Sequence, residues 1–69
     1  MDELQLSVNG ESRSLSGERT IAGLLDELGV TAKHVAVELN GELVPRARHA
    51  EQTLASGDHL EIVTLVGGG

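Results

Sequence analysis

Two Asn-Gly pairs largely decide how this chain can fold, because each closes a segment of alternating apolar and polar residues. The pairs are Asn9-Gly10 and Asn40-Gly41. Alternation with a period of two is typical of a β-strand that buries one face, and Asn-Gly readily adopts the positive φ angles of a two-residue hairpin turn. The sequence therefore predicts two β-hairpins. Their first strands carry the apolar residues Leu4, Leu6 and Val8, and Val35, Val37 and Leu39.

The return strand of each predicted hairpin has a weaker pattern than the first. Residues 11–15 are mostly polar, which predicts a strand at the edge of the sheet. Residues 43–44 predict a short strand that ends at Pro45, because proline has no N–H to donate to a neighbouring strand. A polar connection over residues 46–52 follows, and Leu54 is expected to reach the core from a loop.

Between the two hairpins the apolar period changes to that of a helix. Thr20 is placed to cap the N-terminus of this helix, and Gly29 is placed to end it in the left-handed conformation. Gly23, inside the helix, costs about 1 kcal/mol relative to alanine. Either a close approach of the backbone to a strand or no structural requirement at all would explain it. The apolar positions, spaced i, i+3, i+4 and i+7, are Ile21, Leu24, Leu25 and Leu28.

The last predicted strand, residues 59–66, has apolar residues on both of its faces and follows a turn at Gly57-Asp58. Such a pattern is expected of a strand in the middle of a sheet. Because a single helix covers only one face, we expect Val63 and Leu65 to be exposed on the other face. Neighbouring exposed apolar residues indicate a docking patch for a partner, although singly exposed ones are ordinary. The predicted order is β-β-α-β-β-β, an α+β fold.

Composition limits the classes of function. The 69 residues include no cysteine and no aromatic residue, so disulfides, thiol nucleophiles and thiolate metal sites are excluded. A net charge of −6 with only five Lys and Arg argues against binding to a nucleic acid backbone. No apolar segment approaches the length that crosses a bilayer. We therefore expect no nucleic acid and no membrane partner, and a cytoplasmic location.

The remaining reactive side chains form no recognisable site. His34, His49 and His59 lack the spacing and the neighbouring ligands of a metal centre. Ser56, Asp58 and His59 crowd into one predicted turn, where they cannot align as nucleophile, base and orienting group. No glycine-rich segment carries the lysine that a phosphate-binding loop requires. We predict no catalytic residue, no metal site and no bound cofactor.

The most unusual segment is the ending Gly67-Gly68-Gly69, which divides the chain into a domain over residues 1–66 and a flexible tail over residues 67–69. A glycine tail is thin enough to enter a narrow channel in a partner. Its reactive group is the carboxylate of Gly69, which becomes a good electrophile once attack on the α-phosphate of ATP makes an acyl-adenylate. The nucleotide site would then belong to the partner. An unstructured end without a function is the alternative explanation.

The whole pattern resembles the ubiquitin-like β-grasp family, in which two hairpins, one helix and a last strand precede a C-terminal Gly-Gly. Within that family, the thiamine-biosynthesis sulfur carriers of bacteria are most similar to residues 40–46 (NGELVPR), to Gly57-Asp58 and to residues 61–69 (EIVTLVGGG). The resemblance implies a mixed sheet with one helix packed on one face. It also implies that the chain is a carrier and not an enzyme.

The same resemblance implies a route for sulfur. An adenylyltransferase like the ubiquitin-activating enzymes would use ATP to adenylate Gly69. Sulfur from a desulfurase or a rhodanese-type enzyme would then produce a thiocarboxylate, and thiazole synthase would accept that sulfur. Gly67 and Gly68 would line the partner's channel, and Val63 and Leu65 would lie on the docking face.

Two alternatives fit the same residues. The chain could resemble the small subunit of molybdopterin synthase or another sulfur carrier. It could also be a ubiquitin-like protein modifier, which would join lysines through Gly69.

Overall fold

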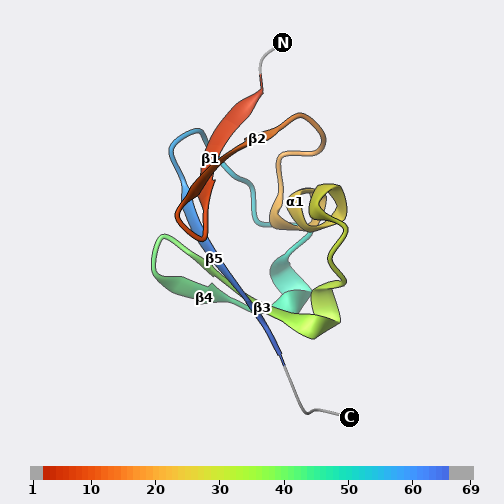
Figure 1. Cartoon of the computed structure of the whole chain (residues 1–69). Helices are drawn as coiled ribbons and strands as arrows, with labels where there is room; N and C mark the ends of the chain where they lie inside the picture. Colours follow the sequence, from red (N-terminus) through yellow and green to blue (C-terminus); the bar gives the residue numbers. More distant parts are fainter. Residues whose placement is uncertain (1–2, 66–69) are drawn as a thin grey trace.

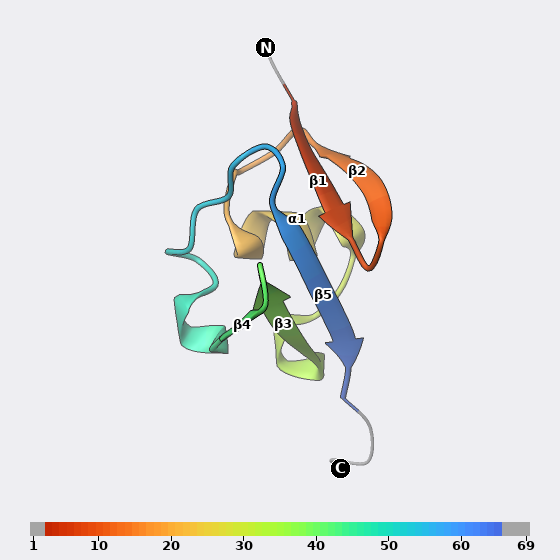
Figure 2. The ribbon, with the colours of Figure 1, turned by 90° about the vertical axis from the view of Figure 1, so that its left-hand side faces the viewer.

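A five-stranded mixed sheet with one α-helix on one of its faces makes up the computed structural model, which describes residues 3–65. The strands lie in the order β2-β1-β5-β3-β4. Figure 1 shows α1 on one side of the sheet, and Figure 2 shows β5 in front with α1 behind it. The elements are β1 (Leu4–Val8), β2 (Glu11–Leu15), α1 (Ile21–Leu28), the 3-10 helix η1 (Ala32–His34), β3 (Val35–Leu39), β4 (Glu42–Val44), the 3-10 helix η2 (Arg46–Arg48) and β5 (His59–Thr64).

This order confirms the predicted α+β arrangement, and it places the last strand at the centre. β5 pairs in parallel with β1 and antiparallel with β3, so both of its edges are covered. The two hairpins pair antiparallel, and their return strands β2 and β4 form the edges of the sheet. The polar pattern of residues 11–15 therefore predicted the edge position of β2 correctly.

The core consists of aliphatic side chains that the strands and α1 direct into the space between them. The inward positions of β1 and β3 alternate with exposed or half-buried ones, as the period of two requires. Leu54 enters this core from the loop before β5, as predicted. The buried apolar residues are Leu4, Leu6, Val8, Leu15, Ile21, Leu24, Leu25, Val35, Val37, Leu54 and Leu60.

The helix begins and ends at the residues that the sequence indicates. The Thr20 side-chain oxygen accepts a hydrogen bond of 3.0 Å from the backbone N–H of Gly23, and Gly29 takes a φ of 75° after the last turn. The suggestion that Gly23 lies against a strand is wrong. A Cβ at this position would collide with the backbone oxygen of Glu18, so the incoming loop is what requires glycine here.

Two predicted boundaries differ in the structure. β5 ends at Thr64, before the predicted end at residue 66, because its partner β3 begins only at Val35. Leu65 instead donates its backbone N–H to the carbonyl oxygen of His34 in η1. The predicted polar connection over residues 46–52 contains η2 and the buried side chain of His49.

His49 is the buried polar side chain of this connection, with 3% of its surface exposed. Its Nε2 lies 3.0 Å from the carbonyl oxygen of Val44, and its own carbonyl accepts the N–H of Ala22 at the start of α1. Its Nδ1 has no hydrogen-bond partner in the part of the chain that the structure describes. His49 therefore joins β4 to the N-terminus of α1, a structural role that the histidine spacing does not reveal.

Candidate functional site

β5 is the element that leads into the glycine tail, and the two hairpin turns hold it from opposite edges. On the β1 edge, the Asn9 side chain accepts the N–H of Ile62 at 2.7 Å and donates to the carbonyl of the same residue at 3.1 Å. On the β3 edge, the Asn40 side chain accepts the N–H of His59 at 2.9 Å, and the Asn40 backbone N–H donates to the carbonyl of His59. Each asparagine thus extends a strand ladder by one residue.

The two apolar residues that the sequence predicted to be exposed lie at the end of β5 and directly after it. Val63 is 58% exposed and Leu65 is 55% exposed, on the face of the sheet opposite to α1. The hydrogen bond from Leu65 to His34 fixes the last described residue against η1. The expectation of exposure is confirmed, while the docking role remains a prediction.

Leu43 on β4 is a third exposed apolar residue, at 67%, and the sequence reading did not select it. Its neighbour Val44 is half-buried and packs against the core. Because side chains alternate along a strand, Leu43 must face the open side of the sheet once Val44 is known to pack against the core, but three residues alone do not show which of the two is buried. Three apolar side chains, Leu43, Val63 and Leu65, therefore form the exposed apolar set of this sheet.

The strand register places acidic residues on one side of this apolar set. Glu38 on β3 lies opposite Leu43 and also opposite Glu61 on β5. Ala36 lies opposite Val63, one step closer to the end of β5. The open face is therefore acidic in its middle and becomes apolar toward Leu65.

The glycines on which the sequence argument depends lie outside the described residues. Gly67, Gly68 and Gly69 therefore have no structural account here, and neither has the predicted boundary between a domain over 1–66 and a tail over 67–69. What the structure supplies is the support for that segment, namely the central strand β5 and, directly after it, Leu65, whose backbone N–H is bound to the carbonyl oxygen of His34.

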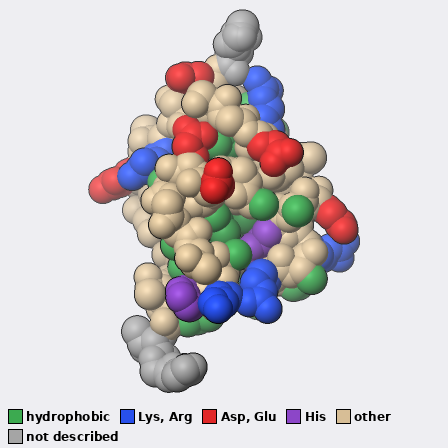
Figure 3. Space-filling model, turned by 90° about the vertical axis from the view of Figure 1, so that its right-hand side faces the viewer, with side chains coloured by type: hydrophobic (Ala, Val, Ile, Leu, Met, Phe, Trp, Pro, Cys, Tyr) green, Lys and Arg blue, Asp and Glu red, His purple; other side chains and the backbone are tan. Residues whose placement is uncertain are grey.

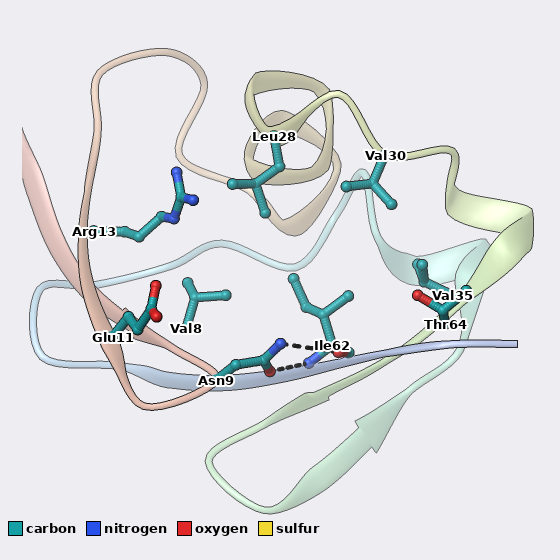
Figure 4. Close-up of a pocket in the computed structure, with 9 residues that line it drawn as sticks. All are labelled: Val8, Asn9, Glu11, Arg13, Leu28, Val30, Val35, Ile62 and Thr64. Carbon is teal, nitrogen blue, oxygen red and sulfur yellow. Dashed lines mark hydrogen bonds between the residues drawn. The ribbon is translucent and has the colours of Figure 1, made fainter.

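A hollow of about 390 Å³ lies on the other face, beside the C-terminal end of α1. Figure 4 shows the side chains of Leu28, Val30 and Ile62 pointing into it, with the charged side chains of Arg13 and Glu11 at one end. An eight-residue helix is only about 12 Å long, which explains why this part of the sheet stays uncovered. The residues that line the hollow include no nucleophilic side chain aligned with a base, so the hollow has no catalytic site of that kind.

The structure keeps the three histidines in separate elements. His34 is in η1, His49 follows η2 and His59 begins β5. Within residues 3–65 no group of three His, Asp or Glu side chains is arranged to hold a metal ion. No helix within the same residues is long and apolar enough to span a bilayer.

Comparison with known proteins connects this architecture to one family. The family model for ThiS matches residues 6–69, which include every strand from β2 onward, α1 and the three terminal glycines. The chain belongs to the ThiS family. A crystal structure of the thiamine biosynthesis protein ThiS from Geobacter metallireducens superposes with a TM-score of 0.79 at 36% identity, and the match covers 96% of this chain and 100% of that one. The predicted β-grasp fold is thereby confirmed.

The curated relatives of this chain differ greatly in how much of their length it covers. The sulfur carrier protein ThiS of Thermus thermophilus is 42% identical over 62 residues, which make up 90% of this chain and 95% of that protein. The thiazole synthase of Paramagnetospirillum magneticum is 47% identical over 66 residues, and that of Magnetococcus marinus is 35% identical over the same number. This chain spans only 20% of each of these two thiazole synthases.

Proposed function

We propose that this chain carries sulfur on Gly69, whose carboxylate is adenylated and then converted to a thiocarboxylate that supplies the sulfur of the thiamine thiazole. The observation that carries the proposal is the match to the ThiS family, because it continues through the terminal glycines. The absence of cysteine from the chain supports the same assignment. A carrier without a thiol can hold sulfur only on a carboxyl-derived group.

The chemistry requires a partner that binds ATP. In the first step an oxygen of the Gly69 carboxylate attacks the α-phosphate of ATP, and pyrophosphate leaves. In the second step a sulfur nucleophile attacks the carbonyl carbon of the acyl-adenylate, and AMP leaves with the former carboxylate oxygen. With sulfide as the nucleophile the product is the thiocarboxylate itself. The chain acts as a co-substrate in both steps and not as the catalyst.

The partners follow from these two steps and from the fate of the sulfur. An adenylyltransferase like the ubiquitin-activating enzymes supplies the ATP site, and a desulfurase or a rhodanese-type enzyme supplies sulfur. Thiazole synthase is the acceptor. Two relatives named thiazole synthase contain a segment similar to this chain, which supports a close association of carrier and acceptor. We place these reactions in the cytoplasm.

The exposed apolar set Leu43, Val63 and Leu65 is the docking face in this proposal. Val63 lies on β5 and Leu65 directly follows that strand on the way to the tail, so a partner seated on them would also receive the glycines. Gly67 and Gly68 would occupy the channel, where the absence of side chains permits a narrow passage. Partners that use the same face would have to bind one after the other.

The decisive experiment measures the intact mass of the protein after reaction with the activating enzyme, ATP and sulfide. We expect replacement of one oxygen by sulfur, located at Gly69 by fragmentation. A variant with one alanine added after Gly69 should acquire no sulfur, because its terminal carboxylate has moved to another residue. The matched control carries the same alanine before Met1 and should react like the unmodified chain.

The same reaction tests the docking face. The double variant Val63→Ser, Leu65→Ser should raise the KM for the carrier about tenfold, because two exposed anchors lose their apolar contact area.

Sulfur on the alanine-extended chain would contradict the carrier proposal. So would an unchanged mass under conditions in which the Thermus ThiS is loaded.

A further inference from the structure

The acidic residues of this chain are distributed unevenly. The chain has a net charge of −6 with eleven Asp and Glu, yet residues 28–37, 43–50 and 62–69 contain none of them. The first two of these segments hold three of the five Lys and Arg residues, namely Lys33, Arg46 and Arg48.

The fold brings the described parts of these three segments to one end of the sheet. Val35 at the start of β3 lies opposite Thr64 at the end of β5. The 3-10 helix η1, which contains Lys33 and directly precedes β3 in the chain, therefore lies at the end of the sheet where β5 stops. Val44 at the end of β4 lies opposite Val37. The following Pro45 and Arg46 therefore continue toward the start of β3.

Both 3-10 helices consequently lie at the end of the sheet where the chain leaves β5, η1 beside β5 and η2 beyond β3 at the outer strand β4. Figure 2 shows η1 and η2 at the same end of the sheet as the tip of β5. Figure 3 shows Lys or Arg side chains and a histidine together at the lower end of the face that it displays. We call Lys33, Arg46 and Arg48 the basic rim.

The cations of the basic rim are exposed and available. Lys33, Arg46 and Arg48 are all exposed, and their side chains make no hydrogen bond or ion pair with any other residue among 3–65. In a protein of opposite overall charge, three unpaired cations around one exit form a local positive field. The apolar residues Val63 and Leu65 border the same exit, so the basic rim is continuous with the proposed docking face.

We propose that the basic rim docks on an acidic surface of the activating enzyme, around the mouth of the channel that receives the tail. This inference rests on the proposed function. An extended chain from Leu65 to Gly69 spans about 13 Å. With the tail extended in the partner's channel, a nucleotide at Gly69 would stand about this distance beyond Leu65, which favours carboxylates of the enzyme as the group that the rim contacts. Such charges chiefly raise the association rate and select the partner.

Charge reversal tests the basic rim without touching the tail. The double variant Arg46→Glu, Arg48→Glu should raise the Kd for the purified activating enzyme, measured without ATP, by about tenfold at low salt. The loss should appear mainly in the association rate and should shrink as ionic strength rises, because salt screens exposed charges. The two exposed side chains have no partners to lose within residues 3–65, so thermal unfolding should change little.

Arg13 offers a matched control. Arg13 is exposed and lies opposite Leu6 on β1. The next residue of β1, Ser7, pairs with His59, the first residue of β5. Arg13 therefore lies near the start of β5, at the end of the sheet opposite to the basic rim. Arg13→Glu should change the Kd less than about twofold, whereas the single variant Arg46→Glu, which has the same net charge, should raise the Kd about threefold.

Three outcomes would overturn the basic rim. The first is an unchanged Kd in the double variant, and the second is an equal rise of the Kd in Arg13→Glu and in Arg46→Glu. The third is a rise of the Kd that appears only when ATP is bound, which would assign the rim to the nucleotide phosphates. Because binding is measured without ATP, these results are independent of the mass experiment on Gly69. If Gly69 is loaded with sulfur and charge reversal leaves the Kd unchanged, the proposed docking of the basic rim is wrong and the carrier function still stands.

Discussion

The two Asn-Gly turns look alike in sequence and in backbone conformation, but they hold β5 in different ways. Asn9 and Asn40 have φ angles of 52° and 51°, and Gly10 and Gly41 have φ angles of 83° and 89°. At the first turn the side chain alone satisfies both backbone groups of Ile62. At the second turn the asparagine side chain satisfies only one group of His59, and the backbone satisfies the other.

The difference follows from the strands that the turns adjoin. β1 pairs with β5 only through Ser7 and Val8, so β1 has already turned away when β5 reaches Ile62, and a side chain must replace the missing strand. β3 pairs with β5 over five residues up to Leu39, and Asn40 follows directly with its own backbone. The amide of Asn9 therefore substitutes for a strand, whereas Asn40 completes one.

Asn9→Gly should have the largest effect, because it preserves the positive φ and removes both hydrogen bonds to Ile62. At about 1 kcal/mol for each net hydrogen bond, with the added cost of glycine flexibility, we expect a loss of about 2–3 kcal/mol in the free energy of unfolding. Urea denaturation measures this loss, and amide exchange at Ile62 should accelerate. A loss no greater than that of Asn40→Gly would contradict the comparison.

Asn40→Gly should cost less, about 1–2 kcal/mol, because only one backbone group of β5, the N–H of His59, loses its partner, whereas Asn9→Gly removes the partners of both backbone groups of Ile62. The variant also loses the hydrogen bond from the Asn40 amide to the Asp58 carboxylate, 3.1 Å long. Urea denaturation under the same conditions gives the value, and protection of the His59 amide should fall while that of Ile62 persists. Equal deprotection of both amides would show that the two turns act as one unit.

Gly10→Ala and Gly41→Ala should give the smallest difference between the two turns. A Cβ at either glycine would meet no atom within 4 Å, so each substitution costs only the backbone strain of a positive φ, about 1 kcal/mol. The two unfolding free energies should agree within about 0.5 kcal/mol. A larger gap would mean that the glycines, and not only the asparagines, distinguish the turns.

Much of the fold could be predicted from the sequence because the relevant signals are local. Thr20 and Gly29 bound the helix through their own capping geometry, and alternation assigned the buried faces of β1 and β3. The failures are non-local. The collision that requires Gly23 comes from the preceding loop at Glu18, and the burial of His49 depends on the meeting of β4 with α1.

The candidate site divides in the same way. Alternation with a single covering helix predicted the exposure of Val63 and Leu65, because that argument needs only the period of the strand. Leu43 was missed because a three-residue strand gives too short a pattern to separate its two faces. The basic rim could not be predicted, since Lys33 and Arg46 are thirteen positions apart and only the strand register brings their segments to one end.

The sequence by itself determined the turns, the helix and the glycine-bearing end, because backbone preferences and periodicity act over a few residues. The tertiary structure alone decided what the two asparagine side chains bind, where β5 stops and which charges surround its exit. Those properties depend on residues far apart in the chain, and only strand pairing in a defined register brings such residues together. Asn9 illustrates both contributions. As an asparagine before glycine it predicts the turn, and its place beside the central strand β5 makes its side chain the hydrogen-bond partner of Ile62.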